Sequence, residues 1–244
     1  MRIKVICPIT TESFEIETKN EISHYVSDEL EIEVEKIDYG TASIEGEYDE
    51  ALAAPGILKL AKKAQDQKFD GVFISCMGDP AVESARELLD IPVVGPCRAS
   101  MLYAADMTHK FSVVTVVDGV IPLIEKVGRQ LGLSNKIVSV RAVDIPVLEL
   151  NDKEKLVTAL FEESLVTIRN HGSQAIILGC TGMIGVNLQL SERLIENGYD
   201  IPVIDPTSVS IRYLESLIKT GLKHSRNAYP LPRNKERNIL DIIS

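Results

Sequence analysis

The stretch Phe73-Ile74-Ser75-Cys76-Met77-Gly78 has a counterpart later in the chain, Ile177-Leu178-Gly179-Cys180-Thr181-Gly182. Two further pairs of segments match in the same order and at nearly the same offset, residues 3–10 with 111–118 and residues 91–96 with 201–206. Several of these segments are short apolar runs without alternation, which is typical of parallel strands covered on both faces. The repeat predicts two half-domains of one architecture, with one cysteine at the same topological place in each.

Short β-branched runs alternate along the chain with longer segments whose apolar residues recur at helical spacing. Strands are expected at residues 3–7, 32–37, 71–76, 92–95, 111–117, 136–141, 175–179 and 202–204, and helices, for example, at 12–29, 51–67, 81–89, 122–131, 152–170 and 207–217. The pattern predicts an α/β fold of two Rossmann-like lobes related by a pseudo-twofold axis. Each lobe is expected to hold a mainly parallel four-stranded sheet flanked by helices, with the site in the cleft between them. The expected division is residues 1–108, 109–222 and a tail at 223–244.

Charge and composition exclude several classes of function. The 244 residues include 26 Lys and Arg against 36 Asp and Glu, a formal net charge of -10, and the scattered bases do not favour nucleic acid. No uncharged stretch reaches the ~20 apolar residues of a membrane-spanning helix, and the first residues do not resemble a signal peptide. We therefore expect a cytoplasmic protein. The spacing of the four cysteines fits neither a zinc pair nor a compact disulfide framework, and no metal site is predicted.

Two helix starts carry recognisable sequence signals. Asp79-Pro80 and Asp205-Pro206 each predict an N-cap carboxylate before a proline at the first helical position. Both turns follow the carboxyl end of an expected parallel strand, the edge at which open α/β sheets bind ligands. Each cysteine loop is also expected to precede a helix N-terminus, whose free N–H groups favour a thiolate. We therefore expect thiols of lowered pKa, and bound carbonyl or carboxylate oxygens, at this edge.

A pseudo-twofold cleft would present Cys76 and Cys180 to opposite faces of one ligand. A carbon acid could lose its proton to a thiolate on one side and regain a proton from a thiol on the other. This chemistry is racemisation without a cofactor. It requires a stabilised planar carbanion, for which backbone N–H groups in the loops are suitable donors.

Four segments together resemble the Asp/Glu/hydantoin racemase superfamily, and within it the hydantoin/allantoin racemase branch. They are Pro8-Ile9-Thr10-Thr11, the segment from Gly40 to Gly56 that contains Ser43-Ile44-Glu45-Gly46, Ser75-Cys76-Met77-Gly78-Asp79-Pro80, and Leu178-Gly179-Cys180-Thr181-Gly182-Met183. The resemblance spans residues 2 to about 217. It implies a cofactor-independent two-base racemase in which Cys76 and Cys180 are the acid/base pair. The implied substrate is a small molecule, a 5-substituted hydantoin or allantoin, and we expect a homo-oligomer. The residues implied to bind the substrate are Pro8, Ile9, Thr10, Met77, Gly78, Thr115, Val116, Thr181 and Gly182.

The chain also departs from the family pattern. Cys7 and Ile9 replace two family asparagines, and Arg98 stands about where the branch has an acidic residue. A cation there would favour an anionic substrate such as aspartate or glutamate. An aspartate/glutamate racemase and a maleate isomerase-type enzyme therefore remain alternatives, and a non-enzymatic small-molecule binding protein is a third.

Several other residues have structural interpretations. Cys7 and Cys97 are expected in the core, Asp49 as a helix N-cap, and Glu45 in a subunit contact. The four histidines, His24, His109, His171 and His224, are expected at the surface. The tail is expected to form an extended strap ending in an apolar clamp at residues 238–243, packed on its own domain or on another subunit.

Overall fold

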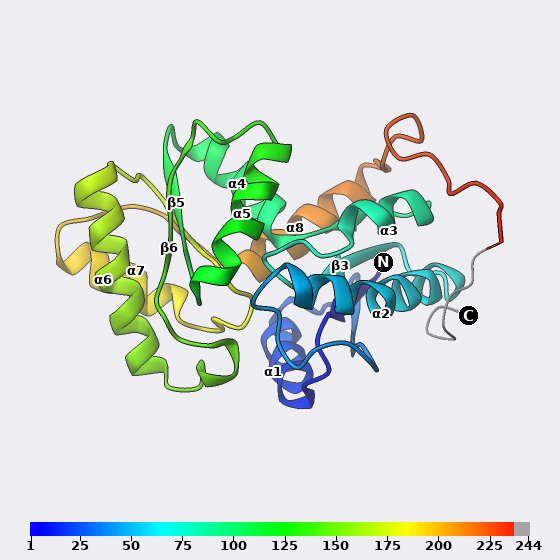
Figure 1. Ribbon diagram of the computed structural model, residues 1–244, viewed down its shortest axis with the longest axis horizontal. Helices are drawn as coiled ribbons and strands as arrows, with labels where there is room; N and C mark the ends of the chain where they lie inside the picture. The colour runs from blue at the N-terminus through cyan, green and yellow to red at the C-terminus, as the bar shows by residue number, and fades with distance from the viewer. Residues whose placement is uncertain (237–244) are drawn as a thin grey trace.

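The chain forms two α/β lobes, seen side by side in Figure 1, in a computed structural model that describes residues 1–236. The strands are β1 (Arg2–Cys7), β2 (Glu31–Lys36), β3 (Gly71–Ile74), β4 (Val93–Val94), β5 (Phe111–Thr115), β6 (Ile137–Ala142), β7 (Ile176–Leu178) and β8 (Val203–Ile204). The helices are α1 (Glu12–Ile22), α2 (Glu47–Asp66), α3 (Val82–Leu88), α4 (Pro96–Met107), α5 (Ile121–Gln130), α6 (Lys153–His171), α7 (Asn187–Glu196) and α8 (Pro206–Lys219). Short 3-10 turns lie at Ser23–Tyr25, Asp118–Val120 and Val147–Glu149.

The two sheets have the same topology. The first has the strand order β2-β1-β3-β4 and the second β6-β5-β7-β8, and all of these pairings are parallel. The central strands β3, β5 and β7 are buried at every residue, as expected for strands covered by helices on both faces. The predicted fold of two parallel four-stranded lobes is confirmed.

Helix α1 ends at Ile22, earlier than the predicted residue 29. The chain then makes a 3-10 turn, and Ser27 pairs with Leu30 in an isolated antiparallel bridge that leads into β2. Helical spacing of apolar residues could not indicate this stop. Two helices, α4 and α7, lie outside the examples named from the apolar spacing.

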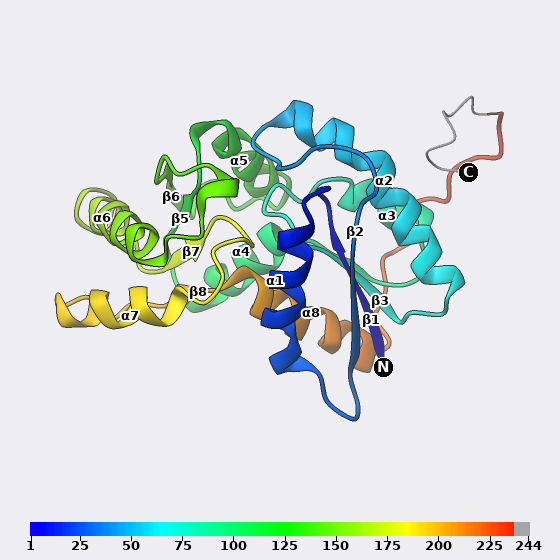
Figure 2. The same ribbon diagram turned by 90° about the horizontal axis from the view of Figure 1, so that it is seen from below.

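The lobes exchange their last helices. Helix α4 follows β4 of the first sheet, yet its Cys97 and Met101 belong to the hydrophobic core of the second lobe, with Phe111. Helix α8 follows β8 of the second sheet and packs Ile211 and Leu214 into the core of the first lobe. Figure 2 shows α8 on the same side of the first sheet as α1. The core of each lobe therefore includes residues from both sides of the predicted boundary at residue 108, and the exchange holds the cleft together.

One of the two predicted helix caps is wrong. Asp205 caps α8 and accepts hydrogen bonds from the N–H groups of Thr207 (2.8 Å) and Ser208 (3.2 Å), as predicted. Asp79 does not cap the helix that follows it, because the chain passes through left-handed conformations at Asp79 (φ 54°) and Ala81 (φ 55°) before α3 begins. Its carboxylate turns instead to the start of α4, where it accepts from the N–H groups of residues 97 (2.9 Å) and 98 (3.1 Å).

The described part of the tail lies on the first lobe. His224 accepts a hydrogen bond at its Nε2 from the N–H of Val93 (2.8 Å), and Arg226 donates to the carbonyl of Arg86 (3.1 Å) and to the carboxylate of Asp90 (2.7 Å). His224 is half-buried under these contacts rather than fully exposed as expected, and burial and the neighbouring Arg86 charge lower its pKa to about 4. The clamp predicted at residues 238–243 lies outside the described residues.

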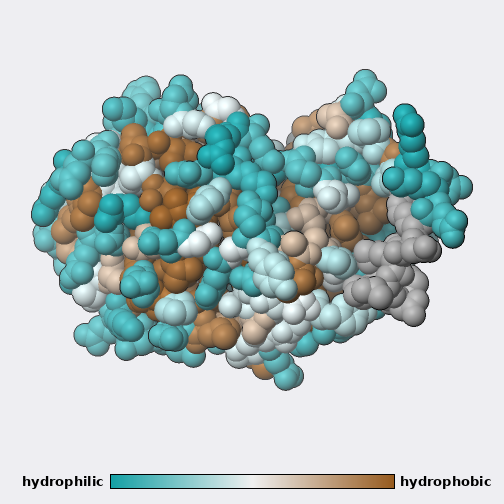
Figure 3. Space-filling view, in the orientation of Figure 1, coloured by the Kyte–Doolittle hydropathy of each residue, from teal (hydrophilic) through white to brown (hydrophobic). Residues whose placement is uncertain are grey.

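The surface of the face seen in Figure 3 is mixed, with hydrophobic residues in separate groups among hydrophilic ones. Within residues 1–236, none of the helices combines the length and the apolar character needed to cross a membrane. This agrees with the sequence, in which charged residues interrupt the apolar runs.

Candidate active site

A cavity lies between the lobes, at the carboxyl ends of the central strands. It has an empty volume of about 590 Å³, counted out to its opening on solvent, a size suited to a small molecule. The first lobe contributes the turn after β1 and the loop after β3, with Cys7, Pro8, Ile9, Ser75, Cys76, Met77 and Gly78. The second lobe contributes Val116 after β5 and the loop after β7, with Gly179, Cys180, Thr181 and Gly182. The cavity therefore occupies the edge of the sheets that the sequence predicted.

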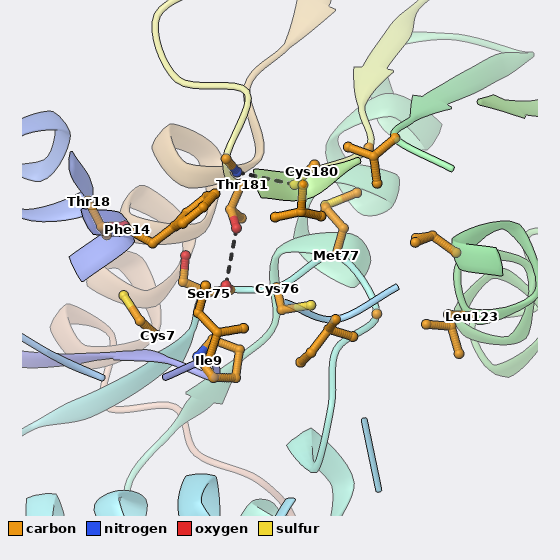
Figure 4. A pocket seen from close by; sticks show the side chains of 18 residues that line it. Cys7, Ile9, Phe14, Thr18, Ser75, Cys76, Met77, Leu123, Cys180 and Thr181 are labelled. Atoms are coloured by element: carbon orange, nitrogen blue, oxygen red, sulfur yellow. Dashed lines mark hydrogen bonds between the residues drawn. The ribbon is translucent and has the colours of Figure 1, made fainter. Parts of the chain in front are cut away.

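The side chains of Cys76 and Cys180 come to this cavity from opposite lobes (Figure 4). The N–H of Gly182 donates a hydrogen bond to the sulfur of Cys180 (3.3 Å). The hydroxyl of Thr181 donates to the carbonyl oxygen of Ser75 (3.1 Å), so a hydrogen bond connects the two cysteine loops across the cleft. The two thiols thus line one cavity and belong to loops held against each other.

Both thiols are harder to ionise than an ordinary cysteine, contrary to the expectation from the sequence. Burial raises the pKa of Cys180 to about 11, while the Gly182 N–H acts in the opposite direction. Burial also raises the pKa of Cys76, again opposed by a backbone amide, that of Gly78. The expected helix N-termini do not lie directly behind the loops, since α3 begins at Val82 and α7 at Asn187. Desolvation of the thiols therefore exceeds the stabilisation that the turn amides give to a thiolate.

Seven of the nine predicted binding residues line the cavity: Pro8, Ile9, Met77, Gly78, Val116, Thr181 and Gly182. Thr10 and Thr115 do not. The hydroxyl of Thr115 donates to the carbonyl of Gly179 (2.9 Å) inside the second lobe, and the hydroxyl of Thr10 donates to the carbonyl of Thr41 (3.2 Å). These two hydroxyls are engaged in holding the chain, which the sequence could not distinguish from ligand binding.

No charged side chain lines the cavity, as far as residues 1–236 define it. Its walls away from the cysteine loops are mainly apolar, with Phe14, Ile44, Val120, Leu123 and Val147. Arg98, the cation expected to favour an anionic substrate, is buried outside the cavity and bound to Asp79 (3.0 Å) and Glu83 (2.8 Å). The structure therefore removes the reason for expecting aspartate or glutamate as the substrate.

Cys7 is also part of the cavity wall. It is buried in the core, as expected, and burial raises its pKa to about 12, while a hydrogen bond from Thr18 acts in the opposite direction. The sequence did not indicate that α1 would supply Phe14 and Thr18 to the same wall. Cys97 is fully buried in the core, as expected.

The segment around Ser43-Ile44-Glu45-Gly46 connects the two lobes, and the predicted helix cap at Asp49 is wrong. Glu45 accepts a hydrogen bond from the N–H of Val147 in the second lobe (2.9 Å), so its carboxylate has a partner within the same chain. Gly46, not Asp49, is the N-cap of α2, and Asp49 in the first turn accepts from the N–H of Glu45 (2.9 Å). Glu50, also in this turn, lies beside the Cys76 loop and was not among the predicted site residues.

Fold and site together define the class of protein: a two-lobed α/β protein with a pair of thiols in the cleft between its lobes. A model of the Asp/Glu/Hydantoin racemase family matches residues 3–214. The chain belongs to this family and is an isomerase of the racemase type, which confirms the resemblance seen in the sequence.

Known relatives match most or nearly all of the chain. A hydantoin racemase from Pseudomonas sp. (strain NS671) is 31% identical over 238 residues, which is 97% of this chain and 94% of that one. A hydantoin racemase from Rhizobium meliloti is 35% identical over 196 residues, 80% of this chain and 79% of that one. The crystal structure of an allantoin racemase from Pseudomonas fluorescens is 33% identical and superposes with a TM-score of 0.90 over 97% of this chain and 99% of that chain.

Proposed function

We propose that this protein racemises 5-substituted hydantoins by a two-base mechanism in which Cys76 and Cys180 are the acid/base pair. The observation that carries the proposal is that two thiols, one from each lobe, line a single uncharged cavity. A planar ring lying between them would expose one face to each sulfur.

In the proposed reaction, the thiolate of one cysteine removes the proton from C5, the ring carbon next to the carbonyl. The electron pair of the broken C–H bond delocalises onto the carbonyl oxygen, where backbone N–H groups of the two loops stabilise the developing charge. The thiol of the other cysteine then donates its proton to the opposite face of C5. One proton is taken and one is given, so the enzyme keeps its net charge and needs no cofactor.

The lining of the cavity favours a neutral substrate with an apolar substituent. Hydantoins carry no charge that needs a partner, and the apolar side chains of Phe14, Ile44 and Leu123 can cover a hydrocarbon substituent. An amino acid or a dicarboxylate would lose its hydration in this cavity without a counter-ion, which is costly. This argues against the aspartate/glutamate racemase and maleate isomerase alternatives. Allantoin is a second candidate, because hydroxyls of Thr18, Ser75 and Thr181 lie at the wall and a relative of known structure is an allantoin racemase.

The test is incubation of each enantiomer of 5-benzylhydantoin and of allantoin in D₂O, with an enzyme-free control. We expect loss of optical rotation with one solvent deuterium at C5 per inversion, faster for the benzyl compound. Variants Cys76→Ser and Cys180→Ser should each lose inversion by about 10²–10⁴-fold. Inversion at the wild-type rate in either variant would exclude the two-base mechanism, and binding without turnover would favour a binding protein.

The expected cytoplasmic location and homo-oligomeric state remain predictions. Light scattering on the purified chain would give the subunit number from its mass. Fractionation of the source cells would locate the protein.

A further inference from the structure

The carboxyl group of Glu50 lies directly against the loop that carries Cys76. Its Oε1 is buried and has no hydrogen-bond partner within the described residues. This oxygen lies 1.9 Å from the point that a Cβ on Gly78 would occupy, so only glycine at position 78 allows the contact. Glu50 therefore packs against the turn whose amide opposes the raised pKa of the Cys76 thiol.

The charges around Glu50 do not neutralise it. Lys126 on α5 pairs with Glu47 (3.2 Å), one turn earlier on α2, and acts on Glu50 only from a distance. Glu47 and Asp79 are acidic and disfavour a further negative charge. Burial, opposed by Lys126 and reinforced by these two acids, raises the pKa of Glu50 to about 7. The carboxyl is thus ionisable near neutral pH, and none of residues 1–236 forms a salt bridge with it.

The corresponding place in the other lobe is apolar. A Cβ on Gly182 would lie 2.7 Å from a ring carbon of Phe14 and 3.1 Å from a methyl carbon of Leu150. The acidic residue that acts on Cys180 is Glu45, and its carboxylate is bonded to a backbone N–H. Within residues 1–236, a buried carboxyl oxygen without a hydrogen-bond partner therefore faces the Cys76 loop and not the Cys180 loop.

We propose that Glu50 is a positioning residue whose negative charge keeps the remaining proton of the singly ionised thiol pair on Cys76, so that Cys180 carries the thiolate when the pair loses its first proton. The charge of Glu50 raises the pKa of Cys76 through space, and Cys180 has the lower pKa of the two. This inference rests on the proposed racemase function but concerns the enzyme before substrate binds.

Turnover in one direction moves the negative charge from Cys180 to Cys76. The proton from C5 ends on Cys180, and the proton of Cys76 ends on the product. Two negative charges would then face each other at Cys76 and Glu50. A solvent proton that binds the Glu50 carboxylate removes this repulsion. Once a proton has returned to the Cys76 thiol, Glu50 releases the solvent proton, and the enzyme again has its thiolate on Cys180.

The preference for a thiolate on Cys180 rather than on Cys76 has a kinetic consequence. Enantiomers have equal free energies, so kcat/KM must be the same in both directions for any variant. The enantiomer that needs Cys76 as its base binds only the form with the thiolate on Cys76, which is the less populated of the two singly ionised forms. Its KM is therefore higher. Because kcat/KM is equal in the two directions, its kcat is higher by the same factor. Removal of the Glu50 charge should bring the two KM values together without changing the ratio of the two kcat/KM values.

The experiment combines Glu50→Gln with single-cysteine backgrounds. In Cys180→Ser, we expect Glu50→Gln to speed alkylation of Cys76 by iodoacetamide at pH 8 about tenfold, the effect of one pKa unit. In Cys76→Ser, the same substitution should change alkylation of Cys180 by less than about twofold. The matched control is Glu47→Gln, an exposed carboxylate on the same helix (61% exposed), which should leave both rates nearly unchanged.

The outcomes separate this inference from the proposed function. Alkylation needs no substrate, so the Cys76-specific effect would support the role of Glu50 even if hydantoins are not turned over. An equal effect on both cysteines, or none, would overturn it even if hydantoins are racemised. If Glu50→Gln does not fold, the pH dependence of Cys76 alkylation in Cys180→Ser decides: an additional inflection near pH 7 supports the coupling, and its absence contradicts it.

Discussion

The loop at Cys76 and the loop at Cys180 leave equivalent strands of the two sheets, and each has a glycine two residues after the thiol. They differ in what lies behind them: the Gly78 turn packs on the carboxyl of Glu50, and the Gly182 turn packs on the ring of Phe14. A repeated fold can thus supply two similar thiols, while the elements packed around it make them unequal. Two-base chemistry uses both properties, because one thiol must be ionised while the other holds a proton.

The largest effect that would test this comparison is the loss of one base at a time. In Cys76→Ser, Cys180 can still remove and return a proton on its own face of the substrate. We therefore expect one enantiomer of a hydantoin to exchange its C5 proton with D₂O without inverting, and the opposite enantiomer to do so in Cys180→Ser. Inversion itself should fall by about 10²–10⁴-fold in both variants. Proton NMR of the separated enantiomers measures the exchange. If the same enantiomer exchanged in both variants, the two cysteines could not act on opposite faces of the substrate.

The raised pKa values predict a strong pH dependence. The reacting form needs one thiolate, and both pKa values lie above neutrality, that of Cys180 at about 11. The ionised fraction, and with it kcat/KM, should therefore rise about tenfold per pH unit from pH 7 to 9. In the single-cysteine variants, Cys180 should be alkylated at lower pH than Cys76. Initial rates corrected for the enzyme-free reaction test the first expectation, and a plateau below pH 8 would show that desolvation is weaker in solution.

A smaller effect concerns the residue that precedes each cysteine. A Cβ on Gly179 would lie 2.5 Å and 2.6 Å from the Cβ and Cα of Thr115, and the backbone there cannot move aside easily. The equivalent residue in the first lobe, Ser75, carries a side chain at the cavity wall. We expect Gly179→Ala to lower the free energy of unfolding by about 2–3 kcal/mol, measured by urea denaturation. Gly46→Ala, which adds a Cβ with nothing within 4 Å, is the control and should cost less than about 1 kcal/mol.

The repeat and the cysteine loops were predictable because they are local. Short β-branched runs identified the eight strands that residues 1–236 form, and the matched segments placed Cys76 and Cys180 at equivalent sheet edges. The helix-cap signal predicted the cap correctly where the carboxylate binds its own helix, as at Asp205. These features depend on neighbours in sequence, or on a pairing that the repeat itself reveals.

The rest depends on contacts between distant segments. Asp79 resembles a local cap, but its carboxylate binds the start of α4 and the side chain of Arg98, and this pairing takes Arg98 out of the cavity. The direction of the thiol pKa shift depends on burial, which the whole cleft determines. Glu50 lies in a segment that the sequence identified, but only the fold brings its carboxyl against the other loop.

The smallest predicted effect concerns the strap, which in the described structure covers β4 of the first lobe. His224 accepts the Val93 N–H only when its ring nitrogen is unprotonated, and its pKa falls from 6.5 to about 4 on folding. The unfolded chain therefore binds the proton first, so the stabilisation is complete above pH 6.5 and is lost as pH falls toward 4. Because the ring is partly exposed, we expect only about 1 kcal/mol, or a Tm loss of about 2–4 °C between pH 7 and pH 5. His224→Gln should remove this part of the pH dependence of Tm. The control His24→Gln, at an exposed histidine, should not. An equal change of Tm with pH in the wild type and in His224→Gln would show that protonation of His224 does not cause the loss of stability.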